Sequence, residues 1–134
     1  GLLVAKVINS TESIHLTSII TQYVSRNAIL YTDEWQGYNN VRRLYKHDFI
    51  DHSTKQYCKG EVCTNRIEGF WGIFKRGIIG VYHKTSKRHL HYYVDEFVFR
   101  YNVRDWQEGE RFNLAVECLA ENRLKYKDLI CKSA

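Results

Sequence analysis

The sequence predicts an α/β domain, and three successive segments of the chain carry this expectation. Residues 2–8 form an apolar, β-rich run, and residues 28–32 form a second one. Between them, apolar side chains recur at the i, i+3, i+4, i+7, i+8 spacing of a helix with one buried stripe, at Leu16, Ile19, Ile20, Tyr23 and Val24. A strand, a helix and a strand in this order favour a parallel pair joined by a right-handed crossover.

The next elements alternate in the same way. We predict a short helix over residues 34–44, with Trp35, Tyr38, Val41 and Leu44 turned inward. Residues 47–52 are predicted to form a further strand. Residues 53–63 are polar and include a glycine, and we interpret them as a loop.

A longer helix begins at Thr64 and ends near Gly77 and Gly80. Its apolar side carries Ile67, Phe70, Trp71, Phe74 and Ile78, whereas Asn65, Glu68, Gly72 and Lys75 share the other side. Because Gly72 has no side chain, a ligand or strand is expected to approach that face closely.

Two further helices are predicted after it. Ser86 is the expected N-cap of the first, whose buried positions are Leu90, Tyr93, Val94, Phe97, Val98 and Tyr101. The last helix is expected over residues 113–124, with Leu114, Val116, Cys118 and Leu119 partly buried.

Composition excludes some classes of protein and favours others. With 44% apolar and 26% charged residues the chain is neither disordered nor embedded in a membrane, and no apolar run reaches the roughly 18–20 residues that span a bilayer. The net charge of +5 is compatible with a polyanionic partner. The absence of proline suits a compact α/β unit, and the absence of methionine leads us to expect a fragment or excised domain. The four cysteines include no CxxC pair, and the chain shows no signal peptide. We therefore expect reduced thiols in an intracellular protein.

Two carboxylates and a lysine form the main candidate site. Asp33 follows the apolar run 28–32, and Glu68 lies on the later helix with 34 residues between them, almost two turns before Lys75. Phosphoryl transfer with two metal ions requires converging carboxylates, and Mg²⁺ or Mn²⁺ prefers oxygen ligands. In this interpretation Asp33 and Glu68 hold metal, Lys75 holds a DNA phosphate, and Asn65 orients the carboxylate or binds phosphate. The alternative is a turn cap at Asp33 and a solvated surface at Glu68 and Lys75.

Four sequence motifs strengthen this interpretation when they are considered in order. TDEWQGY, HDFIDHS, TNRIEGFWGIFKRGIIGVYHK and HLHYYVDEFVFRYNVR resemble the transposase domain of ISXO-type insertion sequences, and the eukaryotic Merlin elements are similar. The resemblance implies a DDE recombinase with an RNase H-like mixed sheet flanked by helices. It also implies that Asp33 is the second catalytic Asp, Glu68 the third carboxylate and Lys75 the associated basic residue. The implied partners are transposon ends and target DNA, bound by a dimer or larger assembly.

The chain departs from this family at its N-terminus. In this family the first catalytic Asp belongs on the first strand of the fold, whereas we expect this chain to start at the third strand. We therefore expect a domain that lacks its first strands and is inactive by itself. Alternatives are a host-retained DNA-binding or interaction module without catalysis, an RNase H-like nuclease, and a relic without function. The expected location is the nucleus in a eukaryote or the cytoplasm in a bacterium.

Two other groups of side chains are weaker candidates. His47, His52, Cys58 and Cys63 have a spacing that permits a zinc site, but the pairs are not tightly spaced, and we favour a histidine near the active-site rim with two loop thiols. A basic cluster of His83, Lys84, Lys87, Arg88, His89 and His91, together with Lys75 and Arg76, is either a DNA-backbone contact or a solvated basic face. Arg100 and Arg104 either close the site or stabilise a helix end.

Overall fold

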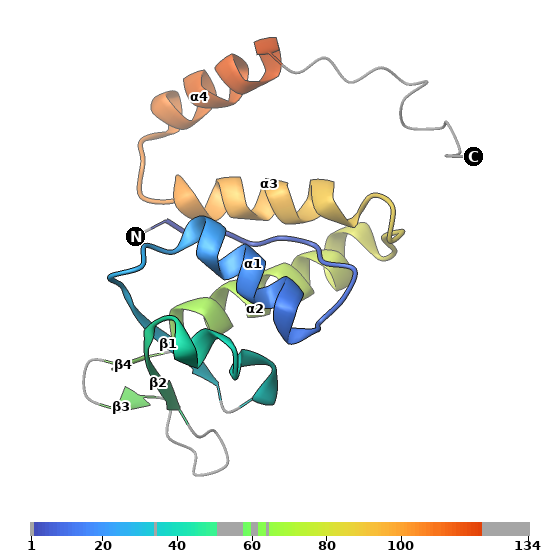
Figure 1. Cartoon of the computed structure of the whole chain (residues 1–134). Helices are drawn as coiled ribbons and strands as arrows, with labels where there is room; N and C mark the ends of the chain where they lie inside the picture. The colour runs from blue at the N-terminus through green and yellow to red at the C-terminus, as the bar shows by residue number, and fades with distance from the viewer. Residues whose placement is uncertain (1, 34, 51–57, 60–61, 64, 122–134) are drawn as a thin grey trace.

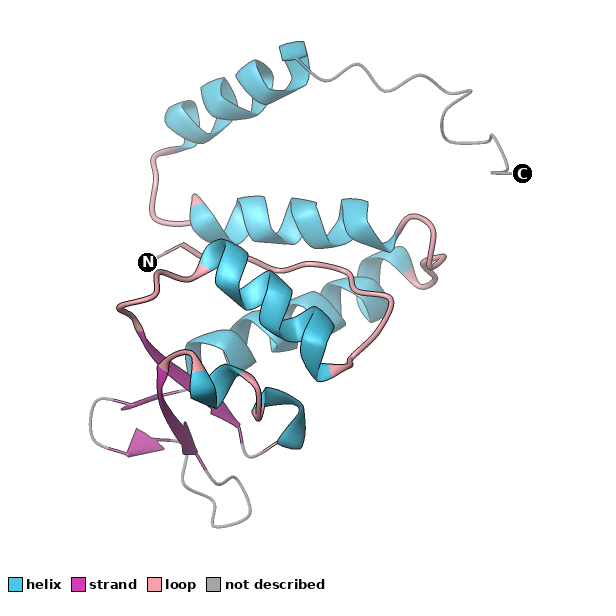
Figure 2. Ribbon diagram, in the orientation of Figure 1, coloured by secondary structure: helices cyan, strands magenta, loops and turns pink. Residues whose placement is uncertain are grey.

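The computed structural model describes residues 2–33, 35–50, 58–59, 62–63 and 65–121. The strands gather on one side of the molecule and helices fill the rest (Figure 2). In chain order the elements are α1 (Ser13–Tyr23), β1 (Ile29–Asp33), the 3₁₀ turns Gln36–Tyr38 and Val41–Arg43, β2 (Lys46–Ile50), β3 (Cys58–Lys59), β4 (Val62–Cys63), α2 (Asn65–Gly77), a π turn (Ile78–Tyr82), α3 (Leu90–Asn102) and α4 (Glu108–Glu121). No helix in the described part of the chain is long and apolar enough to cross a membrane.

The parallel strand pair differs from the predicted one. β1 pairs in parallel with β2, in a register that runs from Ile29 opposite Lys46 to Asp33 opposite Ile50. The connection consists of two 3₁₀ turns, so the helix predicted over residues 34–44 is wrong in type. Within it Val41 is fully buried as predicted, whereas Trp35 and Leu44 are exposed rather than inward. The prediction of a strand over residues 47–52 is confirmed as far as Ile50, and residues 51–52 lie outside the described residues. The loop predicted over residues 53–63 is wrong in part, because β3 and β4 pair antiparallel within it.

The predicted strand over residues 2–8 is wrong. This segment is extended but pairs with no described strand. It runs between α1 and α3 (Figure 1). The side-chain amide of Asn102 replaces a neighbouring strand: its Oδ1 accepts the Leu3 N–H at 2.8 Å, and its Nδ2 donates to the Leu3 carbonyl at 2.9 Å. The β-rich composition therefore produces an extended conformation without a sheet.

The main core lies where this segment meets α2 and α3. Ala5, Phe70, Val94 and Phe97 are buried together. The partly buried side chains around them are Leu3, Phe74, Tyr82, Leu90, Val98 and Tyr101. Gly77 lets the helices approach, since a Cβ at this position would collide with the Phe97 ring. The predicted buried stripe of α3 is thus confirmed. On α2, Phe70 is buried and Phe74 partly buried as predicted, but Ile67 and Trp71 are exposed, and that part of the prediction is wrong.

Several predicted helix boundaries are shifted. The helical path continues past Gly80 to Tyr82 as a π turn, and it ends at His83, which has φ 59°. The Ser86 hydroxyl accepts the His89 N–H at 3.3 Å, and His89 rather than Ser86 directly precedes α3. α4 begins at Glu108, earlier than expected.

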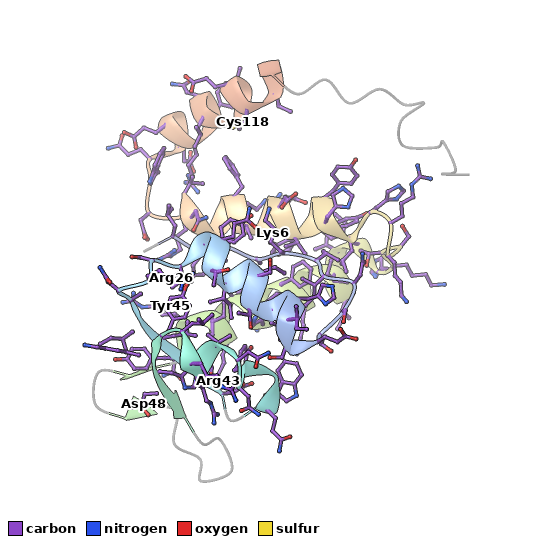
Figure 3. All side chains as sticks on the ribbon, viewed as in Figure 1. Lys6, Arg26, Arg43, Tyr45, Asp48 and Cys118 are labelled. Atoms are coloured by element: carbon purple, nitrogen blue, oxygen red, sulfur yellow. The ribbon has the colours of Figure 1, made fainter. Side chains whose placement is uncertain are left out.

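The predicted partial burial of α4 is mostly wrong. Leu114 is half-buried, but Val116, Cys118 and Leu119 are exposed. In the view of Figure 3, α4 with Cys118 stands apart from the body of the molecule. Away from α4, the Tyr45 hydroxyl donates to the Val24 carbonyl at 2.9 Å. This bond holds the start of β2 against the end of α1.

Candidate functional site

Asp33 and Glu68 line the same pocket, which has a volume of about 330 Å³. Asp33 is the last residue of β1, and Glu68 lies in the first turn of α2. The other residues that line this pocket are Tyr31, Thr32, Tyr38, Ile67 and Trp71. The chain therefore brings together the two carboxylates that the sequence singled out.

Asp33 has one fixed contact with the main chain. Its Oδ1 accepts the Trp35 N–H at 3.3 Å, so the turn-cap interpretation is correct for this oxygen. The negative charge of Asp33 also acts on Tyr38: burial and, second, this carboxylate raise the pKa of the Tyr38 phenol above its ordinary value. The phenol consequently keeps its proton at neutral pH and presents a hydrogen-bond donor beside the pocket.

Behind Asp33, a hydrogen-bonded pair joins β1 to β2. The Thr32 hydroxyl donates to the Asp33 carbonyl at 2.8 Å and lies 2.8 Å from His47 Nε2. A hydroxyl has a single proton to donate, so it accepts from His47, whose Nε2 must carry a proton. Burial and the nearby charge of Arg42 lower the pKa of His47, against a smaller opposing effect of Asp48. His47 is thus a neutral Nε2–H donor at pH 7 and steadies the strand end that carries Asp33.

The packing of other α2 side chains determines that Glu68 faces the pocket. Phe70 is almost completely buried and packs its ring against Trp71, Phe74 and Tyr101. This contact fixes the rotation of α2 about its axis, and the exposed Glu68 then turns toward the pocket. Its place in the first helical turn is also favourable for a carboxylate, because the helix dipole is positive there.

The other predicted site residues of α2 lie on either side of Glu68 in the sequence. Asn65 is the first residue of the helix, and Lys75 follows Glu68 by seven residues, about 10 Å along the axis. Neither is among the pocket-lining residues. The Arg76 guanidinium would stand 3.5 Å from a Cβ on Gly72. The open face expected at Gly72 is therefore bordered by a cation.

Lys84, Lys87 and Arg88 occupy a different region. All three are exposed in the segment between the π turn and α3. α2 begins beside the strands and its other end reaches the side of the molecule where this segment lies (Figure 1). Since the 13 residues of α2 span about 20 Å, the carboxylates and this basic segment lie near opposite ends of the helix.

The predicted zinc set is only partly described. His47 uses its Nε2 on Thr32, and Cys58 is paired with Cys63 in the β3–β4 register. His52 and the cysteine side chains lie outside the described residues. Within the described part of the chain, no three His, Cys, Asp or Glu side chains form a group that would hold a metal ion.

Some residues of the pocket were missed by the sequence analysis. Tyr38 and Trp71 were predicted to face the core because of their apolar spacing, yet both line the pocket. Thr32 and His47 were not assigned roles beside Asp33. The parallel register of β1 and β2 places Thr32 and His47 together, and this register cannot be derived from the sequence of either strand alone.

Comparison with known proteins gives two matches in sequence. The model of the ISXO2-like transposase domain matches residues 1–102. A protein of Haemophilus influenzae described as "Uncharacterized transposase-like protein" is 29% identical over 97 residues, which cover 72% of this chain and 77% of that protein. No solved structure matches the chain.

Proposed function

Because this chain belongs to the ISXO2-like transposase domain family, we propose that it is part of an RNase H-like DDE catalytic domain that cuts and joins DNA. Family membership supports a transposition-related function. The observation that carries the finer proposal is the shared pocket of Asp33 and Glu68, two residues from separate elements with 34 residues between them. The proposal also includes a further Asp from outside these 134 residues, because a two-metal centre requires more than two carboxylates.

The residues of the pocket suit divalent metal. Asp33 and Glu68 supply oxygen ligands of the type that Mg²⁺ and Mn²⁺ prefer, and these two residues would hold the ions. Bound metal would lower the pKa of a nucleophilic water or 3′-hydroxyl and stabilise the leaving oxygen. Thr32 and His47 hold the backbone of Asp33 in position. The protonated Tyr38 phenol is placed to donate to a phosphate oxygen, and the apolar side chains of Ile67 and Trp71 limit the access of water.

A binding measurement tests the metal assignment without requiring catalysis. Mn²⁺ binding to the whole chain would be followed by electron paramagnetic resonance, with Mg²⁺ as competitor. Asp33→Asn and Glu68→Gln should each weaken Mn²⁺ binding at least about tenfold, since each removes one anionic ligand. Asp95→Asn and Glu117→Gln are matched controls at exposed helix positions and should bind as the unchanged chain does.

Two outcomes would contradict the proposal. Equal Mn²⁺ affinity in Asp33→Asn and Glu68→Gln would remove these carboxylates from a metal site. In a longer gene product that cleaves DNA, Glu68→Gln should abolish strand cleavage and spare DNA binding. Unchanged strand transfer in that variant would also refute the role of Glu68, whereas DNA binding without any cleavage by the unchanged protein would favour a non-catalytic DNA-binding module.

A further inference from the structure

The positive charge of this chain is concentrated in one segment. Residues 69–94 contain five Lys and Arg side chains and no Asp or Glu, so the remaining 108 residues carry equal numbers of acidic and basic side chains. The five cations are Lys75, Arg76, Lys84, Lys87 and Arg88. All five are exposed. The formal net charge of +5 therefore belongs entirely to the end of α2, the π turn and the approach to α3.

Within this basic segment lies an exposed apolar tip, formed by Ile79, Gly80 and Val81. Ile79 is 73% exposed and Val81 is 68% exposed, although both belong to the π turn. A Cβ added at Gly80 would meet nothing within 4 Å, so this position faces open space. Large aliphatic side chains so exposed to water, flanked in the sequence by five exposed cations, suggest an interaction site rather than core packing.

The tip is held by an unusual turn that follows it. His83 has φ 59° and ψ −46°, and the Lys84 N–H donates to the Tyr82 carbonyl at 2.6 Å. These features define a γ-turn with positive φ, which is rare for a residue with a side chain. His83 Nδ1 also lies 3.0 Å from the Ile79 carbonyl, which only accepts, so this nitrogen is the donor. The turn thus ties the basic residues directly to the tip.

Tyr82 anchors the tip to α3. Its hydroxyl donates to Glu96 Oε2 at 2.7 Å, and Glu96 Oε1 lies 2.6 Å from the Arg100 guanidinium. The Tyr82 ring packs edge-on against Tyr93, with 4.6 Å between the ring centroids. Tyr82 therefore points into the protein while its neighbours Ile79 and Val81 point outward.

Resting on the proposed DNA function, we propose that Ile79 and Val81 form an apolar wedge that enters the minor groove of duplex DNA. The surrounding cations would hold the phosphates on either side of the wedge. Aliphatic side chains inserted between base steps unstack and kink the duplex, which widens the protein–DNA contact. The tip combines the two components that such binding requires: cations for the backbone and an anchored apolar projection for the bases.

A second copy of this chain fits the tip less well. A symmetric contact through the tip would bring the same five cations of both copies together. Like charges at close range repel, whereas the phosphates of DNA neutralise them and release their counterions. Charge complementarity therefore favours DNA as the occupant of this surface.

The test compares two classes of variant on one duplex. Binding of the whole chain to a fluorescein-labelled duplex with a central TA step would be measured by anisotropy at several salt concentrations. Ile79→Ser with Val81→Ser should lower affinity at least about tenfold without changing the salt slope, because apolar burial is lost and phosphate contacts remain. Lys87→Ala with Arg88→Ala should lower both affinity and slope.

A matched control and a direct probe of stacking complete the experiment. Ile14 on α1 is also 73% exposed, so Ile14→Ser changes the same side chain on an element outside the basic segment and should leave affinity unchanged. A duplex carrying 2-aminopurine at the TA step should brighten on binding the unchanged chain, since unstacking relieves its quenching, and should not brighten with the double serine variant. Circular dichroism would confirm that each variant is folded.

The outcomes separate this inference from the proposed function. If the unchanged chain binds the duplex and the double serine variant binds with equal affinity and equal brightening, the wedge is refuted and the DNA function stands. A variant that loses only self-association in sedimentation also refutes the wedge, and assigns the tip to contact between copies. Failure of the unchanged chain to bind any duplex would refute both.

Discussion

Replacing Thr32 by valine should destabilise the protein through the loss of a single hydroxyl. The exposed fraction of Thr32 is only 9%, and its Oγ1 takes part in two hydrogen bonds of 2.8 Å. Valine keeps the branched shape but can neither donate to the Asp33 carbonyl nor accept from His47 Nε2. Both lost contacts lie at the strand end that bears the candidate metal ligand.

The expected magnitude follows from these two bonds. A hydrogen bond of this kind contributes about 0.5–1.5 kcal/mol net, so losing both should lower the free energy of unfolding by about 1–3 kcal/mol. Thr32→Ser keeps the hydroxyl and loses one methyl group, at a cost of about 0.8 kcal/mol. Thr21 provides a matched control, because its hydroxyl donates to the Ser18 carbonyl at 2.9 Å in an exposed position. Thr21→Val should change stability by about 0.5 kcal/mol or less.

Urea unfolding at pH 7, followed by tryptophan fluorescence, measures these differences. The m-value should stay the same in all variants, since the surface exposed on unfolding hardly changes. A Thr32→Val protein as stable as the parent would refute the argument. So would a serine variant as unstable as the valine variant, because the methyl group rather than the hydroxyl would then matter.

Three further predictions concern the pocket and the core. The pKa of His47 is lowered in the folded state, so in acid the unfolded state binds more protons than the folded state. The contribution of His47 to stability is therefore complete above about pH 6.5 and falls as the pH drops below it. In His47→Gln, the urea midpoint should consequently decrease less on acidification than in the unchanged protein. Phe70→Ala, at a side chain only 1% exposed, should cost about 3–5 kcal/mol, with Phe70→Leu costing less in the same assay. Asn102→Ala should raise the hydrogen-exchange rate of the Leu3 amide, and an unchanged rate would contradict the pairing.

Much of the candidate site could be predicted because its signals are local. A carboxylate at the end of an apolar run and a carboxylate on a helix face are each visible within a few residues. Asp33 and Glu68 were found in this way, and so were the buried stripe of α3 and the burial of Phe70 on α2. The periodicity of a helix fixes which side chains share a face, and burial of Phe70 then selects that face.

The remainder depends on contacts between distant residues. Residues 2–8 have the composition of a strand, but the groups that bind Leu3 belong to Asn102, 99 residues further on. Apolar spacing also cannot distinguish a core from the wall of a pocket, and for this reason Tyr38 and Trp71 were predicted to lie inward. For α4, the apolar residues of the sequence predicted partial burial of Leu119, but this side chain is exposed.

The Asn102–Leu3 pairing also bears on how the chain is made. Translation adds roughly 5–20 residues per second, so residue 102 is synthesised about 5–20 s after residue 3. During that time residues 2–8, which are mostly apolar, have neither Asn102 nor the buried rings of α3 to contact. Residues 2–8 must therefore wait until α3 has been synthesised, and a chaperone that binds extended apolar segments would have this interval in which to bind them.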